Sequence, residues 1–187
     1  MIVAGVDEVG RGPLAGPVIT AAVVLPSHYD LPRLTDSKKL TAKRREILSV
    51  SIKEQAVEWA FGEASVAEID QLNILHATML AMQRAVAALN TKPQKILVDG
   101  NRTPDFGIPA KAIVGGDGIE PSISAASIIA KVARDKLMAD YSIEYPHYGF
   151  ERNSGYPTKQ HRDALLEYGV TPIHRQSFAP VRAILEN

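Results

Sequence analysis

The sequence predicts an α/β fold in which a five-stranded mixed sheet carries helices on both faces and is followed by a small C-terminal helical appendage. Short runs rich in β-branched residues alternate with longer segments of helical periodicity. Three meandering strands come first, and two further strands are then separated by helices. The expected strands comprise residues 2–9, 18–25, 56–64, 95–98 and 110–114. The expected helices comprise residues 41–55, 73–89, 121–141 and 158–168.

The first two strands are expected to pair antiparallel. Residues 10–17 between them are dense in Gly and Pro and are too few for a crossover connection. Pro26 ends the second strand, and a polar loop follows over residues 27–39. Thr41 is a good N-cap for the first helix.

The second half of the sheet follows a long helix that has apolar residues at helical spacing, namely Ile74, Leu75, Met79, Met82, Ala85, Val86 and Leu89. Two short buried strands come next and end in turns, at Asp99-Gly100 and at residues 115–118. Pro121 is well placed to begin the next helix. The first turns of that helix are mostly small residues, which allow close packing on a sheet.

The character of the chain changes at residue 144, where Pro and Gly interrupt the periodicity. Thr158 then caps a short helix, Gly169 is a plausible stop signal after it, and residues 171–185 are short and mixed. We therefore expect one main domain, residues 1–143, and a helical appendage, residues 144–187.

Composition narrows the function classes. The 187 residues are 45% hydrophobic, so the chain can bury a sizeable core, and the net charge of zero gives no global signature of nucleic-acid binding. There are no cysteines, which excludes disulfides, zinc-thiolate sites and thiol catalysis. We see no signal peptide and no apolar run near the roughly 20 residues that span a bilayer, and we expect a cytoplasmic monomer without a membrane partner.

Two adjacent carboxylates, Asp7 and Glu8, lie near the end of the first strand, and Gly10-Arg11-Gly12 follows them after Val9. Burying a carboxylate costs several kcal/mol unless it is paired or bound to a metal. Asp99 lies at the end of the fourth strand, and Asp117 lies in a Gly-rich loop after the fifth. If strands one and four are parallel neighbours, these acids converge at one edge of the sheet.

Carboxylate oxygens without His or Cys suit Mg²⁺ or Mn²⁺ rather than zinc. Two such cations about 4 Å apart can clamp the attacking water and the leaving oxygen of a phosphodiester. Each acid alone can instead be a turn or capping residue, and Asp99-Gly100 is a common turn pair. Ideal alternation also sends Asp7 and Glu8 to opposite faces. We therefore expect the first strand to end or bulge at Glu8, which Gly10 would permit.

Six motifs closely resemble those of bacterial type 2 ribonuclease H (ribonuclease HII), and the resemblance covers nearly the whole chain. The motifs are Gly5-Val6-Asp7-Glu8-Val9-Gly10-Arg11-Gly12, Asp36-Ser37-Lys38-Lys39-Leu40, Val98-Asp99-Gly100-Asn101, Ser124-Ala125-Ala126-Ser127 with its continuation to Asp135, Gly155-Tyr156-Pro157-Thr158, and His174-Arg175-Gln176-Ser177-Phe178. The first motif and the Ser-Ala-Ala-Ser stretch are highly specific.

The resemblance implies an RNase H-like fold and hydrolysis of the RNA strand in RNA–DNA hybrids. It also implies cleavage 5′ to single ribonucleotides embedded in duplex DNA, leaving 3′-hydroxyl and 5′-phosphate ends. The family's catalytic and metal-binding acids fall on Asp7, Glu8, Asp99 and Asp117. Its ribose-reading motif falls on Gly10, Arg11 and Gly12, and its junction-sensing tyrosine falls on Tyr156.

The residues themselves allow these roles and also plainer ones. Glycines let backbone groups approach a 2′-hydroxyl, and Arg11 can hold a phosphate, but a glycine turn with a solvated arginine reads equally well. Tyr156 can stack on a sugar or base, or pack in the core. Ser37, Lys38 and Lys39 lie in a basic stretch that can contact duplex phosphates or be a solvated face.

Two further residues, His174 and Arg175, can contact substrate or anchor the C-terminal segment. Two rival functions stay open at this stage: a nuclease for branched or purely DNA substrates, and a non-catalytic module that binds hybrids. The C-terminus carries no clear motif for a sliding clamp, and that partner stays open as well.

Overall fold

The computed structural model describes residues 1–187 and contains one five-stranded sheet in the order β3-β2-β1-β4-β5. The strands are β1 Val3–Val9, β2 Val18–Val24, β3 Glu58–Ala64, β4 Lys95–Asp99 and β5 Ala110–Ile113. β1 pairs antiparallel with β2, and β2 pairs antiparallel with β3. β1 pairs parallel with β4, and β4 with β5. The predicted mixed sheet and the antiparallel first pair are confirmed, and the condition that strands one and four are parallel neighbours is met.

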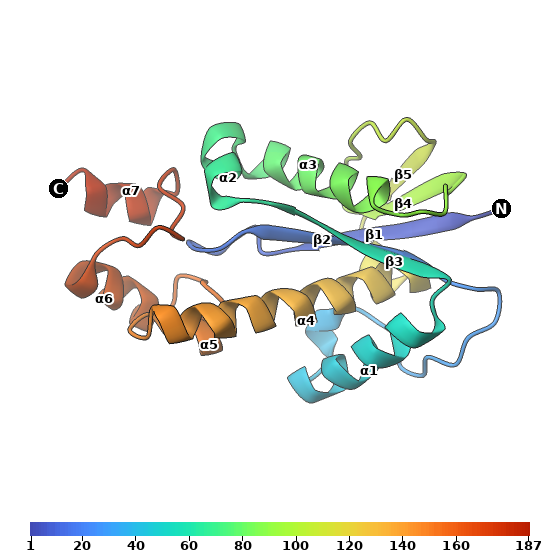
Figure 1. Ribbon diagram of the computed structural model, residues 1–187, viewed down its shortest axis with the longest axis horizontal. Coiled ribbons are helices and arrows are strands. Elements are labelled where there is room, and N and C mark those ends of the chain that lie inside the picture. Colours follow the sequence, from blue (N-terminus) through green and yellow to red (C-terminus); the bar gives the residue numbers. More distant parts are fainter.

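Seven α-helices and two 3₁₀ turns complete the fold. They are η1 Ser37–Lys39, α1 Ala42–Gln55, α2 Val66–Leu72, α3 Ile74–Ala87, η2 Gly116–Gly118, α4 Pro121–Glu144, α5 Phe150–Asn153, α6 Lys159–Tyr168 and α7 Ala179–Leu185. α3 covers one face of the sheet, whereas α4 and α1 cover the other (Figure 1). α5, α6 and α7 gather at the end of the sheet where β1 finishes. None of the helices has the length and apolar character needed to cross a membrane.

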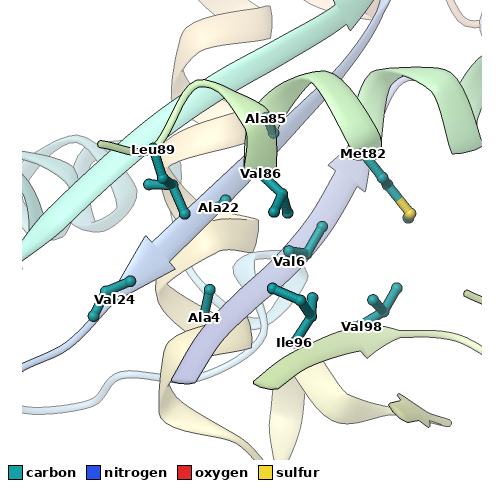
Figure 2. Packing of buried hydrophobic residues seen from close by; sticks show 10 residues of the cluster. All are labelled: Ala4, Val6, Ala22, Val24, Met82, Ala85, Val86, Leu89, Ile96 and Val98. Carbon is teal, nitrogen blue, oxygen red and sulfur yellow. The ribbon is translucent and has the colours of Figure 1, made fainter. Parts of the chain in front are cut away.

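The face under α3 is packed by residues that alternate along the inner strands. Figure 2 shows Ala4 and Val6 of β1 beside Ile96 and Val98 of β4, with Met82 and its neighbours on α3 above them. Period-two alternation places the intervening residues of β1, Gly5 and Asp7, on the opposite face. The Asp7 carboxylate therefore lies on the sheet face opposite to α3.

The face under α4 depends on a close approach of helix and sheet. A Cβ added at Gly5 would lie 2.2 Å from the carbonyl carbon of Ser122, so only glycine fits there. The start of α4 consequently lies directly against the middle of β1. Its buried small residues, Ala125 and Ala126, pack with Ala21 and Val23 of β2. This packing fixes how far α4 stands from the carboxyl end of β1.

The structure differs from the prediction at several boundaries. α2, α5 and α7 were not predicted as helices, and α4 continues to Glu144 rather than ending near residue 141. α2 begins at a capping box, in which Ser65 accepts from the backbone of Glu68 and the Glu68 side chain accepts from the backbone of Ser65. A seven-residue helix carries too short a periodic pattern to be found by spacing alone.

Residues 144–187 pack into a cluster that also takes residues from the first part of the chain. Tyr148, Phe150 and Leu165 lie in it together with Leu14 and Met138. The backbone N–H of Arg175 donates to the carbonyl of Leu14, and that of Leu14 donates to the carbonyl of Gly155. The C-terminal segment is thus tied to the loop that follows β1. A functional division at residue 143 stays a prediction.

Candidate active site

Three carboxylates from three different segments lie together at the carboxyl end of the sheet. One oxygen from each of Asp7, Asp99 and Asp117 lies within 4.8 Å of the others. Asp7 is 4% exposed and Asp117 is 8% exposed. All three carboxylates line a cavity of about 280 Å³, whose wall also contains Glu8 and the Gly10-Arg11-Gly12 loop. The convergence expected from the strand ends is therefore observed.

The register of β1 against β4 explains why Asp7 and Asp99 meet. Val6 pairs with Val98 in the parallel ladder, so one further step along both strands brings Asp7 beside Asp99. Both residues follow a side chain of the α3 face, and alternation turns both carboxylates to the α4 face. The two strands thus deliver two acids to one point.

Asp117 joins them because the chain after β5 turns back on itself. Gly115 has a φ of +67°, which favours glycine, and η2 begins directly after it. The N–H of Asp117 donates to Oδ1 of Asp99 at 3.1 Å. The Ser124 hydroxyl of α4 donates to the carbonyl of Asp117. These two hydrogen bonds hold the loop against β4 and against α4.

Glu8 does not require the strand break that the sequence suggested. β1 keeps a regular antiparallel register with β2 through Val9, so the expected strand end or bulge at Glu8 is wrong. Glu8 nevertheless lines the same cavity as Asp7. Pairing with β4 ends at Val6, which leaves that edge of β1 open beyond Asp7. The longer Glu8 side chain can reach the cavity around this edge, although it is not among the three clustered oxygens.

Burial and mutual repulsion make the cluster electrostatically strained without a cation. Burial raises the pKa of Asp7 well above its ordinary value, and the charges of Glu8 and Asp99 raise it further. Burial also raises the pKa of Asp117 to about 6, with repulsion from Asp99 and Asp36 adding to it. The N–H of Glu8 donates to Oδ1 of Asp7 at 2.7 Å and partly offsets the effect.

The donor set fits a hard divalent cation. It consists of carboxylate oxygens from separate elements, without His or Cys, as Mg²⁺ and Mn²⁺ prefer. A cation there would remove the repulsion that raises the pKa of Asp7 and of Asp117. Asp7, Asp99 and Asp117 are the residues that would hold it, with Glu8 at the same cavity.

The basic residues predicted to contact phosphate differ in their positions. Lys38 lines the cavity, where burial opposes its charge but Asp36, Asp117, Asp7 and Asp99 together raise its pKa. Ser37 also lines the cavity, but it is buried and accepts a 2.8 Å hydrogen bond from the Ser127 hydroxyl of α4. Lys39 is exposed and is not part of the cavity wall.

The glycine loop and Tyr156 close the other side of the cavity. Gly10 has a φ of +91°, and a Cβ added to it would lie 2.1 Å from Nε of Arg134. Tyr156 is 40% exposed, and its ring lies over Gly12, where an added Cβ would come within 3.2 Å of Cε1. Arg11 is exposed at the cavity mouth.

Two residues of α4, Ser127 and Lys131, also line the cavity and were given no role from sequence. They are four residues apart and therefore lie on one face of the helix. Lys131 donates to Asp135 at 2.8 Å. Their spacing within α4 was a usable signal, but which face of α4 meets the carboxylates depends on the contact at Gly5.

Comparison with known proteins identifies the family of this chain. The family model for Ribonuclease HII matches residues 4–181. The chain belongs to the ribonuclease HII family. A ribonuclease HII of Shewanella halifaxensis is 60% identical over 182 residues, which cover 97% of this chain and 90% of that protein. The family and the fold make this chain a metal-dependent hydrolytic nuclease of the ribonuclease H type that acts on RNA–DNA hybrids.

Solved ribonuclease HII structures share the fold. The ribonuclease H2 of Pyrococcus horikoshii superposes with a TM-score of 0.82 at 30% identity and covers 100% of this chain and 98% of that one. The ribonuclease HII in a PCNA complex from Archaeoglobus fulgidus gives a TM-score of 0.78 at 26% identity, with 95% of both chains covered. The rival of a non-catalytic binding module is thereby excluded, because the family is enzymatic.

Proposed function

We propose that this ribonuclease HII cuts on the 5′ side of single ribonucleotides embedded in duplex DNA, in addition to hydrolysing the RNA strand of hybrids. The cut would leave 3′-hydroxyl and 5′-phosphate ends. The observation that carries this proposal is the shared cavity of the carboxylate cluster and the Gly10-Arg11-Gly12 loop. A site that tests one ribose beside the scissile phosphate needs no longer stretch of RNA.

In this proposal the catalytic and metal-binding residues are Asp7, Glu8, Asp99 and Asp117, and the ion is Mn²⁺ or Mg²⁺. When bound, such a cation activates water and stabilises the charge that develops on a phosphodiester. The carboxylates hold a fixed cluster of negative charge at the end of β1 and β4. Burial keeps bulk water from screening it.

The remaining residues of the cavity would bind and orient the nucleic acid. Arg11 and Lys38 provide positive charge for phosphate oxygens at two sides of the cluster. Gly10 and Gly12 let the backbone approach a ribose 2′-hydroxyl, the group that separates RNA from DNA. Tyr156 presents an exposed ring for stacking at the junction. Ser37 and Lys39 are also proposed to contact phosphate, although Ser37 is buried and Lys39 lies outside the cavity wall.

The reaction consumes one water for each bond broken. The water oxygen adds to phosphorus, the bond from phosphorus to the 3′-oxygen breaks, and the leaving 3′-oxygen takes one proton from solvent to become the 3′-hydroxyl. The only carboxylates that line the cavity are the four acids assigned here to metal binding, so the water proton passes to solvent or to a substrate phosphate oxygen.

Hybrid duplex and ribonucleotide-containing DNA are the proposed partners, and residues 144–187 would contribute to their binding through Tyr156. Since such DNA lies in the cytoplasm of a bacterium, we propose that location for a monomeric enzyme. The archaeal relative was solved with PCNA. A sliding clamp stays an open partner for this chain, in which α7 carries no clear clamp-binding motif.

Asp7→Asn tests the proposed function. The change keeps the shape of the side chain but removes one charge of the cluster, so cleavage in Mn²⁺ of a duplex with one ribonucleotide should fall by roughly 10²- to 10³-fold or more. Binding of the duplex and thermal unfolding should change little. Asp140→Asn, at an exposed acid of α4, is the matched control and should cleave normally. Normal turnover by Asp7→Asn would sink the assignment.

The same substrate separates the remaining rival, a nuclease for DNA alone. Product sizes on a sequencing gel should show one cut, directly 5′ to the ribonucleotide, and an all-DNA duplex should stay intact. Cutting along the whole duplex would instead support the rival.

A further inference from the structure

Arg175 is a fully buried cation whose hydrogen bonds end on one loop. Its Nε donates to the carbonyl of Gly16 at 2.9 Å, and its Nη2 donates to that of Gly10 at 2.6 Å. Its Nη1 donates to the carbonyls of Arg11 at 2.9 Å and Pro13 at 2.8 Å. Four carbonyls of residues 10–16 thus point at one guanidinium group, which is 0% exposed.

No carboxylate pairs with this guanidinium, and its ring neighbour is Phe178, with Cζ 5.0 Å from the ring centroid. Burial lowers the pKa of Arg175 to about 9, and the nearby charge of Arg134 adds to the effect. A buried charge without a counter-ion is costly, and an apolar residue of similar volume anchors a segment at less cost. Simple anchoring of the C-terminal segment therefore does not account for an arginine here.

The direction of the carbonyls has a consequence for the amides. The chain has no cis peptide bond, and in a planar trans peptide the C=O and the N–H point in opposite directions. The carbonyls of Gly10 and Arg11 point at Arg175, so the N–H groups of Arg11 and Gly12 point away from it. Neither N–H donates to any acceptor within the chain. Both residues line the cavity that holds the carboxylates.

We propose that Arg175 is a positioning residue for ribose recognition: by gathering the carbonyls of Gly10 and Arg11, it turns two consecutive amide donors toward the substrate. The acceptor these donors fit is an oxygen of the sugar, the 2′-hydroxyl. This inference rests on the proposed function, in which the Gly10-Arg11-Gly12 loop reads that group. Arg175 itself lies behind the loop and touches no substrate.

Arg134, the other buried arginine near this loop, binds carbonyls of different residues. Its Nε donates to the carbonyl of Pro17, its Nη2 to that of Ala15 and its Nη1 to that of Ser154. These carbonyls lie beyond the three glycine-loop residues, at the return of the loop to β2 and at the segment before Tyr156. Of the two buried arginines, Arg175 is therefore the one that sets the peptides of Arg11 and Gly12.

The test is Arg175→Lys, which keeps a cation but cannot reach four carbonyls with three donors on one nitrogen. Binding is measured by fluorescence anisotropy in the Asp7→Asn background, with two duplexes that differ only in one ribonucleotide. The preference for the ribonucleotide duplex should fall about tenfold, the equivalent of one good hydrogen bond. Affinity for the all-DNA duplex should change less than about twofold, since it involves no 2′-oxygen.

Leu165→Ala is the matched control. Leu165 is buried in the C-terminal cluster, but its apolar side chain forms no hydrogen bond to the carbonyls of residues 10–12. It should lower the melting temperature and keep the preference. Equal loss of preference in both variants would reduce Arg175 to a structural residue and overturn the proposal. If the chain with arginine at 175 shows no preference at all, the proposed function fails instead.

A second measurement needs no change at residue 175 and applies even if Arg175→Lys does not fold. In ¹H–¹⁵N spectra of the Asp7→Asn protein, the amide resonances of Arg11 and Gly12 should shift more with the ribonucleotide duplex than with the all-DNA duplex. Equal shifts with both duplexes would overturn the proposal.

Discussion

At the scale of single residues, the cavity is lined by four acids and by three cations, Arg11, Lys38 and Lys131. Lys38 is exposed, yet Asp7, Asp99 and Asp117 all raise its pKa. The same ammonium therefore serves two opposed purposes. It weakens the attraction of the cluster for a metal ion, and in the proposed function it supplies attraction for a phosphate.

Lys38→Met separates the two effects. Mn²⁺ affinity, measured by isothermal titration calorimetry, should rise about two- to fivefold, because a screened surface charge contributes at most about 1 kcal/mol. Duplex affinity should fall, and the slope of log affinity against log salt should decrease in size by about one. Lys43→Met, which removes an exposed charge outside the cavity, should leave Mn²⁺ affinity unchanged. Weaker Mn²⁺ binding by Lys38→Met would contradict this view of the cavity.

At the scale of elements, the approach of α4 to β1 determines which side chains meet the carboxylates. Gly5 permits that approach, and Ser127 and Lys131 reach the cavity only from this position of the helix. The Ser127 hydroxyl then donates to Ser37 and connects α4 to η1. One glycine thus helps to assemble the cavity from elements far apart in the chain.

Gly5→Ala should destabilise the protein by about 3 kcal/mol, because the added Cβ meets backbone atoms that cannot move without shifting α4. Urea denaturation at constant pH measures the change. Gly118→Ala is the comparison, since its added Cβ would meet nothing within 4 Å and its φ is not in the left-handed region. It should cost less than about 1 kcal/mol. Similar losses in both variants would show that the close approach is not the cause.

This packing also explains what sequence reasoning could and could not predict. Strand periodicity and the rule of carboxyl-end sites predicted the order of elements and the meeting of Asp7, Asp99 and Asp117. Both depend only on local pattern and parallel pairing. Lys131 was missed because its side of α4 is defined by a contact with β1, distant in sequence. The bulge at Glu8 was wrongly expected because side-chain alternation alone places Glu8 on the face opposite to Asp7. The expectation did not consider that β1 has no paired neighbour on the β4 side beyond Val6.

At the scale of the whole molecule, the C-terminal segment is joined to the cavity through a buried chain of hydrogen bonds. The N–H of Thr171 donates to Nδ1 of His174 at 3.0 Å, so neutral His174 carries its proton on Nε2. That proton is donated to Nε2 of His161 at 2.9 Å. His161 then carries its proton on Nδ1 and donates to the carbonyl of Tyr156 at 3.0 Å. The backbone of Tyr156 is thus held from residues 171–174.

This chain of hydrogen bonds requires both histidines to be neutral. Burial lowers the pKa of His174 to about 3, and repulsion from His161 contributes, while burial also lowers the pKa of His161. In the unfolded chain the reference pKa is 6.5. Below that pH the unfolded state gains protons that the native state does not accept. Stability is therefore complete above pH 6.5 and is lost as the pH falls toward about 3.

Between pH 7.5 and pH 5.5 the two histidines together should lower the free energy of unfolding by roughly 1–3 kcal/mol, from about 1.4 kcal/mol per proton and pH unit for each histidine. In the metal-free protein the raised pKa values of Asp7 and Asp117 oppose this fall, so the histidine contribution is read from the difference in slope between wild type and variant. Urea denaturation at stepped pH values measures the slope. His174→Asn should lower stability at pH 7.5, since it breaks the chain to Tyr156, but it should flatten the slope by about one proton. His147→Asn, which removes a surface histidine, should keep the wild-type slope. An unchanged slope in His174→Asn would mean that His174 takes up its proton equally well in the folded and unfolded protein, which contradicts a hydrogen-bond chain that requires neutral His174.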